Sequence, residues 1–102
     1  MQKFEIIISQ EAFEMLKEHI AFIANVDKAA AEKTKTLIVN SIKGLNELPN
    51  RYPFFDEDYI PKNKYHKMFV ENWYLVLYQI KDSTVYVDYI VDCRQEYNWL
   101  IK

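Results

Sequence analysis

The segment from Thr84 to Asp92 constrains the fold more than any other part of the chain, because apolar and polar side chains alternate along it. One set of alternate positions holds Val85, Val87, Tyr89 and Val91. Successive side chains of a strand point to opposite faces, so this period of two predicts a β-strand with one buried face. We expect these four side chains to face the core. The opposite face of the sheet should then be partly open and able to bind a partner.

Three other segments have the composition of strands. They are rich in β-branched and aromatic residues, and they span Lys3–Ser9, Lys64–Glu71 and Trp73–Ile80. Glu71-Asn72 and Lys81–Ser83 separate the last three strands at hairpin length. The sequence therefore predicts an N-terminal strand and, later, an antiparallel meander of three strands.

Two helices are predicted near residues 9 to 26 and 28 to 48. The first carries an apolar stripe with helical spacing, formed by Phe13, Leu16, Ile20 and Ile23. Ser9 is a suitable N-cap for this helix, and Pro49 ends the second helix. Because the connection between them is short, we expect an antiparallel hairpin packed on one face of the sheet. The predicted class is α+β, with a mostly antiparallel four-stranded sheet, a short C-terminal segment, and one domain over residues 1–102.

Length and charge limit the possible functions. The chain has 102 residues, enough for one domain with its own core, and a formal net charge of -2, which provides no overall positive field for nucleic acid. No apolar run reaches the roughly 20 residues of a membrane span. A single cysteine fits a reducing compartment. We expect a soluble, cytoplasmic protein without a membrane partner.

Few residues are suited to metal or cofactor chemistry. The two histidines, His19 and His66, lie on different predicted elements, and Cys93 is the only cysteine, so the close ligand spacing of zinc sites is missing. Gly44 is the only glycine, which excludes a GxGxxG motif or a P-loop. We predict no metal and no cofactor.

Four residues are candidates for chemistry on the open face. His66 and Lys67 are neighbours on a strand, so they point to opposite faces. A lone strand histidine or lysine is more often a solvated surface group, but a cation that shares the open face with Arg94 could hold a phosphate. Tyr97 follows Arg94 by one helical turn, so the two side chains could project together. The structural alternatives are a surface ion pair for Arg94, packing for Tyr97, and a small buried apolar role for Cys93.

The order of elements resembles the RelE/ParE superfamily of toxins from type II toxin–antitoxin systems. The most specific part is Tyr65 to Ile101, where "NWYLVLYQI" is similar to the family's third strand and "VDYIVDCRQEYNWLI" to its last strand and tail. The resemblance covers nearly the whole chain. It implies a small cytoplasmic bacterial protein, part of a growth-inhibiting or plasmid-stabilisation module, which a cognate antitoxin neutralises. It implies no particular oligomeric state.

The family holds two activities, and the residues match both in part. RelE-like members are metal-independent endoribonucleases that cleave mRNA on the ribosome, and the resemblance would then make His66, Lys67, Arg94 and Tyr97 catalytic. ParE-like members bind DNA gyrase. Leu75 in "YLVLY" stands where the family often has an arginine, and this weakens the ribonuclease interpretation. A third possibility is a degenerate, non-toxic protein-binding module of the same fold.

Overall fold

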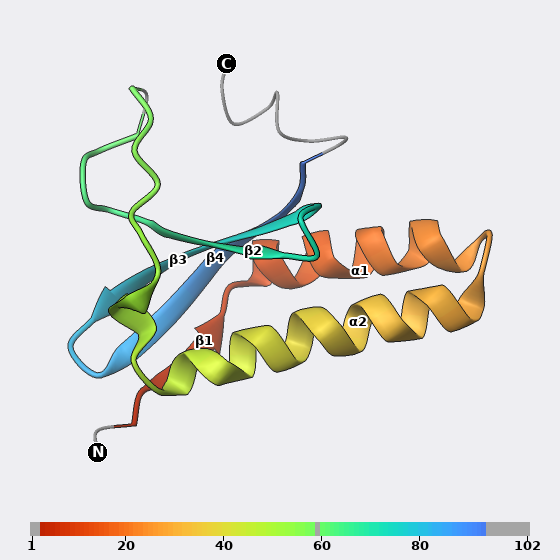
Figure 1. The fold of residues 1–102 in the computed structure, drawn as a ribbon, viewed down its shortest axis with the longest axis horizontal. Coiled ribbons are helices and arrows are strands. Elements are labelled where there is room, and N and C mark those ends of the chain that lie inside the picture. Colours follow the sequence, from red (N-terminus) through yellow and green to blue (C-terminus); the bar gives the residue numbers. More distant parts are fainter. Residues whose placement is uncertain (1–2, 59, 94–102) are drawn as a thin grey trace.

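The computed structural model describes residues 3–58 and 60–93 (Figure 1). The elements in chain order are β1 (Glu5–Ile8), α1 (Gln10–Ala24), α2 (Lys28–Lys43), the short 3₁₀ helices η1 (Gly44–Asn46) and η2 (Pro49–Arg51), β2 (His66–Val70), β3 (Tyr74–Lys81) and β4 (Thr84–Asp92). The predicted C-terminal segment, including Arg94 and Tyr97, lies outside the described residues.

The four strands form one sheet in the order β1-β4-β3-β2. β1 pairs with β4 in parallel, and the other two pairs are antiparallel. The sheet is therefore mixed, with one parallel pair, and the predicted α+β class with a mostly antiparallel four-stranded sheet is confirmed. β1 and β2 are the edge strands.

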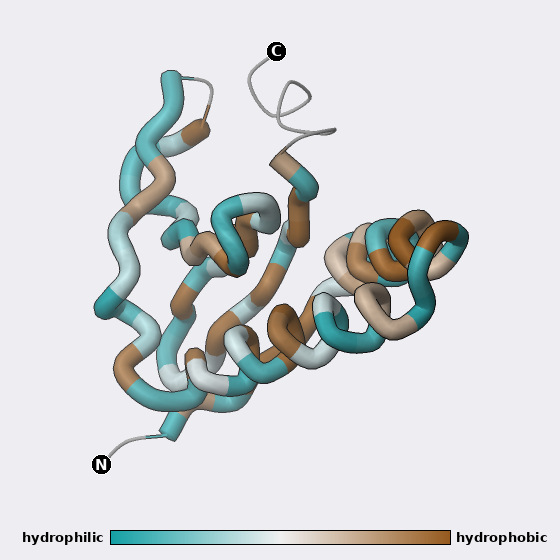
Figure 2. The backbone as a smooth tube through the Cα atoms, turned by 45° about the vertical axis from the view of Figure 1, so that its right-hand side comes forward, coloured by the Kyte–Doolittle hydropathy of each residue, from teal (hydrophilic) through white to brown (hydrophobic). Residues whose placement is uncertain are grey.

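The two helices lie side by side as an antiparallel hairpin (Figure 1). Ser9 caps α1, because its Oγ accepts a hydrogen bond from the Ala12 amide at 3.0 Å, and Asp27 caps α2 in the same way. Apolar and hydrophilic residues alternate along both helices (Figure 2), and the most buried apolar residues include Leu16, Ile38 and Ile42. Within the described residues, no helix combines the length and apolarity needed to cross a membrane.

The two hairpin turns include the residues predicted from the sequence. Glu71 and Asn72 connect β2 to β3 with φ angles of 56° and 63°, and Asp82 begins the next turn with a φ of 56°. Asn and Asp tolerate this left-handed region better than most residues, which explains their presence in turns.

A β-bulge in β4 changes which side chains face the helices. Tyr78 pairs with Val87, whereas Leu77 pairs with Tyr89, so Asp88 is an extra residue in the strand. An extra residue reverses the alternation of the side chains that follow it. The prediction that four alternate side chains share the helix-facing side is therefore correct before the bulge and wrong for Tyr89 and Val91.

Two apolar clusters result, one on each face of the sheet. The helix-side cluster includes Val85, Val87 and Ile90 of β4, which are fully buried. The second cluster lies on the opposite face, and its buried members are Phe55, Tyr65, Leu75, Leu77 and Val91. We call this opposite face the outer face. It is more buried than the sequence indicates, because a loop covers part of it.

Candidate functional site

The loop before β2 crosses part of the outer face. The Phe55 amide donates to the Tyr65 carbonyl at 2.7 Å, and the Lys67 amide donates to the Pro53 carbonyl at 2.9 Å. These bonds hold the loop against the start of β2, and the Phe55 side chain packs in the outer apolar cluster. Phe69, farther along β2, stays half exposed. The predicted open face is thus open only in part.

The bulge residue Asp88 organises the polar part of the outer face. Its Oδ2 accepts hydrogen bonds from the Tyr65 hydroxyl at 3.1 Å and from Gln79 Nε2 at 2.6 Å. Its main-chain carbonyl accepts from Ser9 Oγ at 3.2 Å. The carboxylate is therefore held in place by two donors, and it brings negative charge to this face.

Two phenols of the outer face hold their protons tightly. Burial raises the pKa of Tyr65 well above its ordinary value, and the charge of Asp88 raises it further. Burial also raises the pKa of Tyr89, with further contributions from Glu11 and Asp88. Near neutral pH both groups can therefore donate hydrogen bonds, but they are poorly suited to remove a proton from a substrate.

Lys67 lies on the outer face, and His66 does not. Lys67 pairs with Leu77 of the outer cluster, and its Nζ lies 6.0 Å from the centre of the Phe55 ring. Lys64 places its Nζ 5.4 Å from the centre of the Tyr65 ring. The prediction that His66 and Lys67 point to opposite faces is supported by the ladder, since His66 pairs with Tyr78 of the helix-side cluster.

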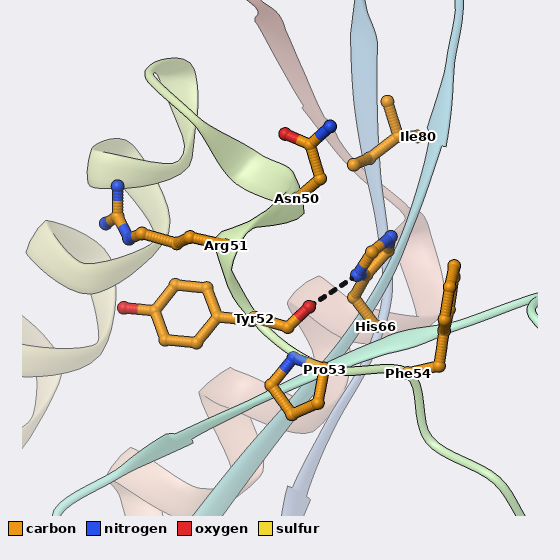
Figure 3. A pocket seen from close by; sticks show the side chains of 7 residues that line it. All are labelled: Asn50, Arg51, Tyr52, Pro53, Phe54, His66 and Ile80. Carbon is orange, nitrogen blue, oxygen red and sulfur yellow. Dashed lines mark hydrogen bonds between the residues drawn. The ribbon is translucent and has the colours of Figure 1, made fainter.

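His66 is buried rather than a solvated surface group. Only 6% of the residue is exposed, and its Nδ1 donates to the Tyr52 carbonyl at 2.8 Å (Figure 3). Its ring lies between Phe54, at 4.3 Å between centroids, and Tyr78, at 5.2 Å. A pocket of about 560 Å³ opens beside it, lined by Asn50, Arg51, Tyr52, Pro53, Phe54, His66 and Ile80.

Arg94 and Tyr97, the other two predicted site residues, lie outside the described residues. Cys93, just before them, is partly buried and packs against the outer cluster. Burial raises the pKa of its thiol, and the charge of Asp92 adds to this effect. The thiol is therefore a weak nucleophile, as expected for a small apolar residue.

The helical hairpin carries a groove that the sequence does not predict. It measures about 360 Å³, and its lining is apolar apart from two lysines: Phe13, Leu16, Lys17, Ile20, Ala21, Ala24 and Lys35. The sequence assigns Phe13 to the buried stripe, but the side chain is 48% exposed. Lys17 Nζ lies 5.5 Å from the centre of the Phe13 ring. An apolar groove with lysines at its margin is suited to an amphipathic segment with acidic residues.

Metal ligands are scattered in the described part of the chain. Residues 3–58 and 60–93 contain no group of three or more His, Cys, Asp or Glu side chains placed to hold a metal ion.

Comparison with known proteins identifies the fold. No family model matches the chain, and no curated protein matches its sequence. Among solved structures, it is similar to a chain of the chromosomal ParDE TA system from P. aeruginosa. The two are 15% identical with a TM-score of 0.73, and the match covers 90% of this chain and 98% of that chain. The chain thus shares the fold of that chain.

Proposed function

We propose that the chain is the toxin of a type II toxin–antitoxin module, which inhibits bacterial growth and is neutralised by a cognate antitoxin. The observation that carries this proposal is the fold likeness to a ParDE chain over 90% of the present chain. The resemblance of the strand and tail sequences to the RelE/ParE superfamily points the same way. The proposed site of action is the cytoplasm, and the proposed role includes plasmid stabilisation.

The described outer face favours DNA gyrase as the target over ribosome-bound mRNA. Metal-free cleavage of RNA needs several cations around one phosphate, together with a group that takes a proton from a 2′-hydroxyl. Here Lys67 shares the face with the Asp88 carboxylate, which repels phosphate, and the Tyr65 phenol keeps its proton. His66 is held on the opposite side of the sheet. These features support a toxin that acts by contacting a protein.

The groove on the helical hairpin supports an antitoxin partner. The apolar lining around Phe13 and Leu16 can take the apolar face of an amphipathic segment, and Lys17 and Lys35 can pair with acidic residues beside it. Aromatic residues in such a groove are frequent binding hot spots.

A growth assay with two biochemical readouts tests the proposed function. The toxin is expressed alone and together with the product of the neighbouring gene, and the purified protein is added to gyrase supercoiling and to ribosomal mRNA cleavage reactions. We expect growth arrest that co-expression relieves, inhibition of supercoiling, and intact mRNA. Cleaved mRNA with normal supercoiling would contradict the gyrase target. Normal growth with a bound partner protein would instead indicate the non-toxic binding module.

The docking groove is tested with a matched pair of variants. Phe13 and Phe22 both lie on α1 and are 48% and 58% exposed, but only Phe13 lines the groove. We expect Phe13→Ala to weaken antitoxin binding at least about 30-fold, as loss of a hot spot of about 2 kcal/mol does. Phe22→Ala should change affinity less than about threefold. Equal losses for both variants in calorimetric titrations would place the antitoxin elsewhere.

A further inference from the structure

One ring nitrogen of the largely buried His66 has no hydrogen-bond partner among the described residues and remains accessible from the pocket. Nδ1 of His66 is bonded to the Tyr52 carbonyl, but its other ring nitrogen, Nε2, has no hydrogen-bond partner among the described residues. Nε2 is also not sealed from solvent, since the described residues contain no fully buried side-chain nitrogen or oxygen without a partner. Figure 3 shows this nitrogen directed away from the Tyr52 carbonyl, toward the side of the pocket with Asn50 and Ile80.

The bond to Tyr52 fixes what Nε2 offers to a ligand. A carbonyl oxygen can only accept, so Nδ1 carries a proton. In the neutral imidazole, Nε2 then has a free lone pair and accepts a hydrogen bond. In this neutral form the pocket presents an acceptor whose position is fixed by the bond to Tyr52, on a residue that is only 6% exposed. A ligand that donates an N–H or O–H would satisfy it.

The walls of the pocket limit the shape of that ligand. Phe54 and Tyr78 cover the two faces of the His66 ring, so a ligand has to approach the imidazole edge. Phe54, Pro53 and Ile80 provide apolar surface, and Asn50 provides an amide that both donates and accepts. The volume of about 560 Å³ lies within the usual range of small-molecule sites, roughly 300–1,000 Å³.

An anion or a metal ion fits the pocket less well. The Arg51 guanidinium donates to the Glu47 carbonyl at 2.9 Å and stacks on the Tyr52 ring, with its carbon 5.0 Å from the ring centre. In Figure 3 the Arg51 and Tyr52 side chains extend away from His66. The described residues also form no metal-binding group of three or more ligand side chains.

We propose that this pocket is a binding site for a small planar nitrogen heterocycle, of the nucleobase class, which donates a ring N–H to Nε2 of His66. The ring packs against Phe54 and Ile80, and the Asn50 amide contacts its polar edge. This site lies on the opposite side of the sheet from Lys67 and Asp88, so its occupancy is independent of growth inhibition through the outer face.

Two xanthines that differ at one nitrogen test the proposal. Theophylline has an N7–H donor, and caffeine carries a methyl group at that nitrogen. Each is titrated into the full-length protein while the side-chain ¹⁵N resonances of His66 and the backbone resonances of Asn50, Phe54 and Ile80 are followed. We expect theophylline to shift the Nε2 resonance and to bind about tenfold more tightly than caffeine, as loss of one buried hydrogen bond implies.

A variant locates the binding event. His66→Phe keeps an aromatic ring between Phe54 and Tyr78 but removes Nε2, so it should bind theophylline no more tightly than caffeine. A melting curve shows whether His66→Phe folds. If this variant does not fold, the difference in affinity between theophylline and caffeine for the unchanged protein still tests the proposal. Equal affinities for the unchanged protein, absence of binding at millimolar concentration, or shifts confined to other residues would overturn the proposal.

Discussion

Two buried phenols, Tyr65 and Tyr78, and one partly buried phenol, Tyr89, predict that the protein unfolds at alkaline pH. The pKa values of Tyr65, Tyr78 and Tyr89 are raised, in each case chiefly by burial. Tyr78 is fully buried and donates to the Pro49 carbonyl, and Tyr65 is 8% exposed and donates to Asp88. Ionising these hydroxyls in the folded protein would leave buried negative charge and break both bonds.

The sign and size of the effect follow from proton linkage. Phenols of the unfolded chain lose their protons near pH 10, and those of the folded chain keep them to higher pH. Above about pH 10 the unfolded state binds fewer protons, so the free energy of unfolding falls by about 1.4 kcal/mol per pH unit for each tyrosine. The stabilisation is fully present below about pH 10 and is lost as the pH rises toward the folded-state pKa.

The total effect is large enough to measure. Tyr65 and Tyr78, which have the larger shifts, together give a slope of about 3 kcal/mol per pH unit. A 102-residue domain has a total stability of about 5–15 kcal/mol, so two pH units remove much of it.

Urea unfolding from pH 8 to pH 12, combined with tyrosinate absorbance, measures this slope. Tyr78→Phe and Tyr65→Phe should each reduce it by about 1.4 kcal/mol per pH unit. Tyrosinate absorbance should appear in the unfolded fraction first. Constant stability up to pH 12, or ionisation of all tyrosines before unfolding, would refute the argument and would restore the outer-face phenols as candidate bases.

Other variants test the core, the bulge and the C-terminal segment. Leu77→Ala, in the outer cluster, should cost about 2–5 kcal/mol in urea unfolding, and a loss below 1 kcal/mol would mean that the loop does not cover this face. Asp88→Ala should cost about 1–3 kcal/mol, because Tyr65 and a second donor lose their acceptor, and an unchanged denaturation midpoint would contradict this. Arg94→Ala should keep its melting temperature yet relieve growth inhibition, since exposed ion pairs contribute about 0–1 kcal/mol; unfolding would indicate a structural role. Cys93→Ser should alter neither property, so toxicity lost with this change would point to a reactive thiol.

Local signals in the sequence were sufficient for most of the fold. The Ser9 cap, the apolar stripe through Leu16, and the Asn and Asp of the turns depend on near neighbours in the chain, and the structure confirms them. Phe13 differs because its exposure depends on how the hairpin lies on the sheet, which the spacing of apolar residues does not determine.

The bulge was missed although a signal was present. Ile90 and Val91 are adjacent apolar residues, and both are fully buried, which a regular strand with one open face does not require. Such a pair indicates either a strand that is buried on both faces or a change of register. Both occur here: the outer cluster buries Val91 on the second face, and the bulge shifts the register of β4. The environment of His66 could not be predicted in this way, because it depends on Tyr52 and Phe54 in a long loop whose pairing with β2 is non-local.

The separation of His66 from Lys67 bears directly on the choice of target. A ribonuclease site would need the basic residues of β2 to act on one phosphate, yet the ladder places these two side chains on opposite faces and packs each against aromatic rings. Lys67 shares its face with the Asp88 carboxylate, which reduces the attraction of this face for phosphate. The same arrangement of two lysines, one carboxylate, protonated phenols and half-exposed Phe69 is typical of a surface that contacts protein, where mixed polar and aromatic groups give specificity.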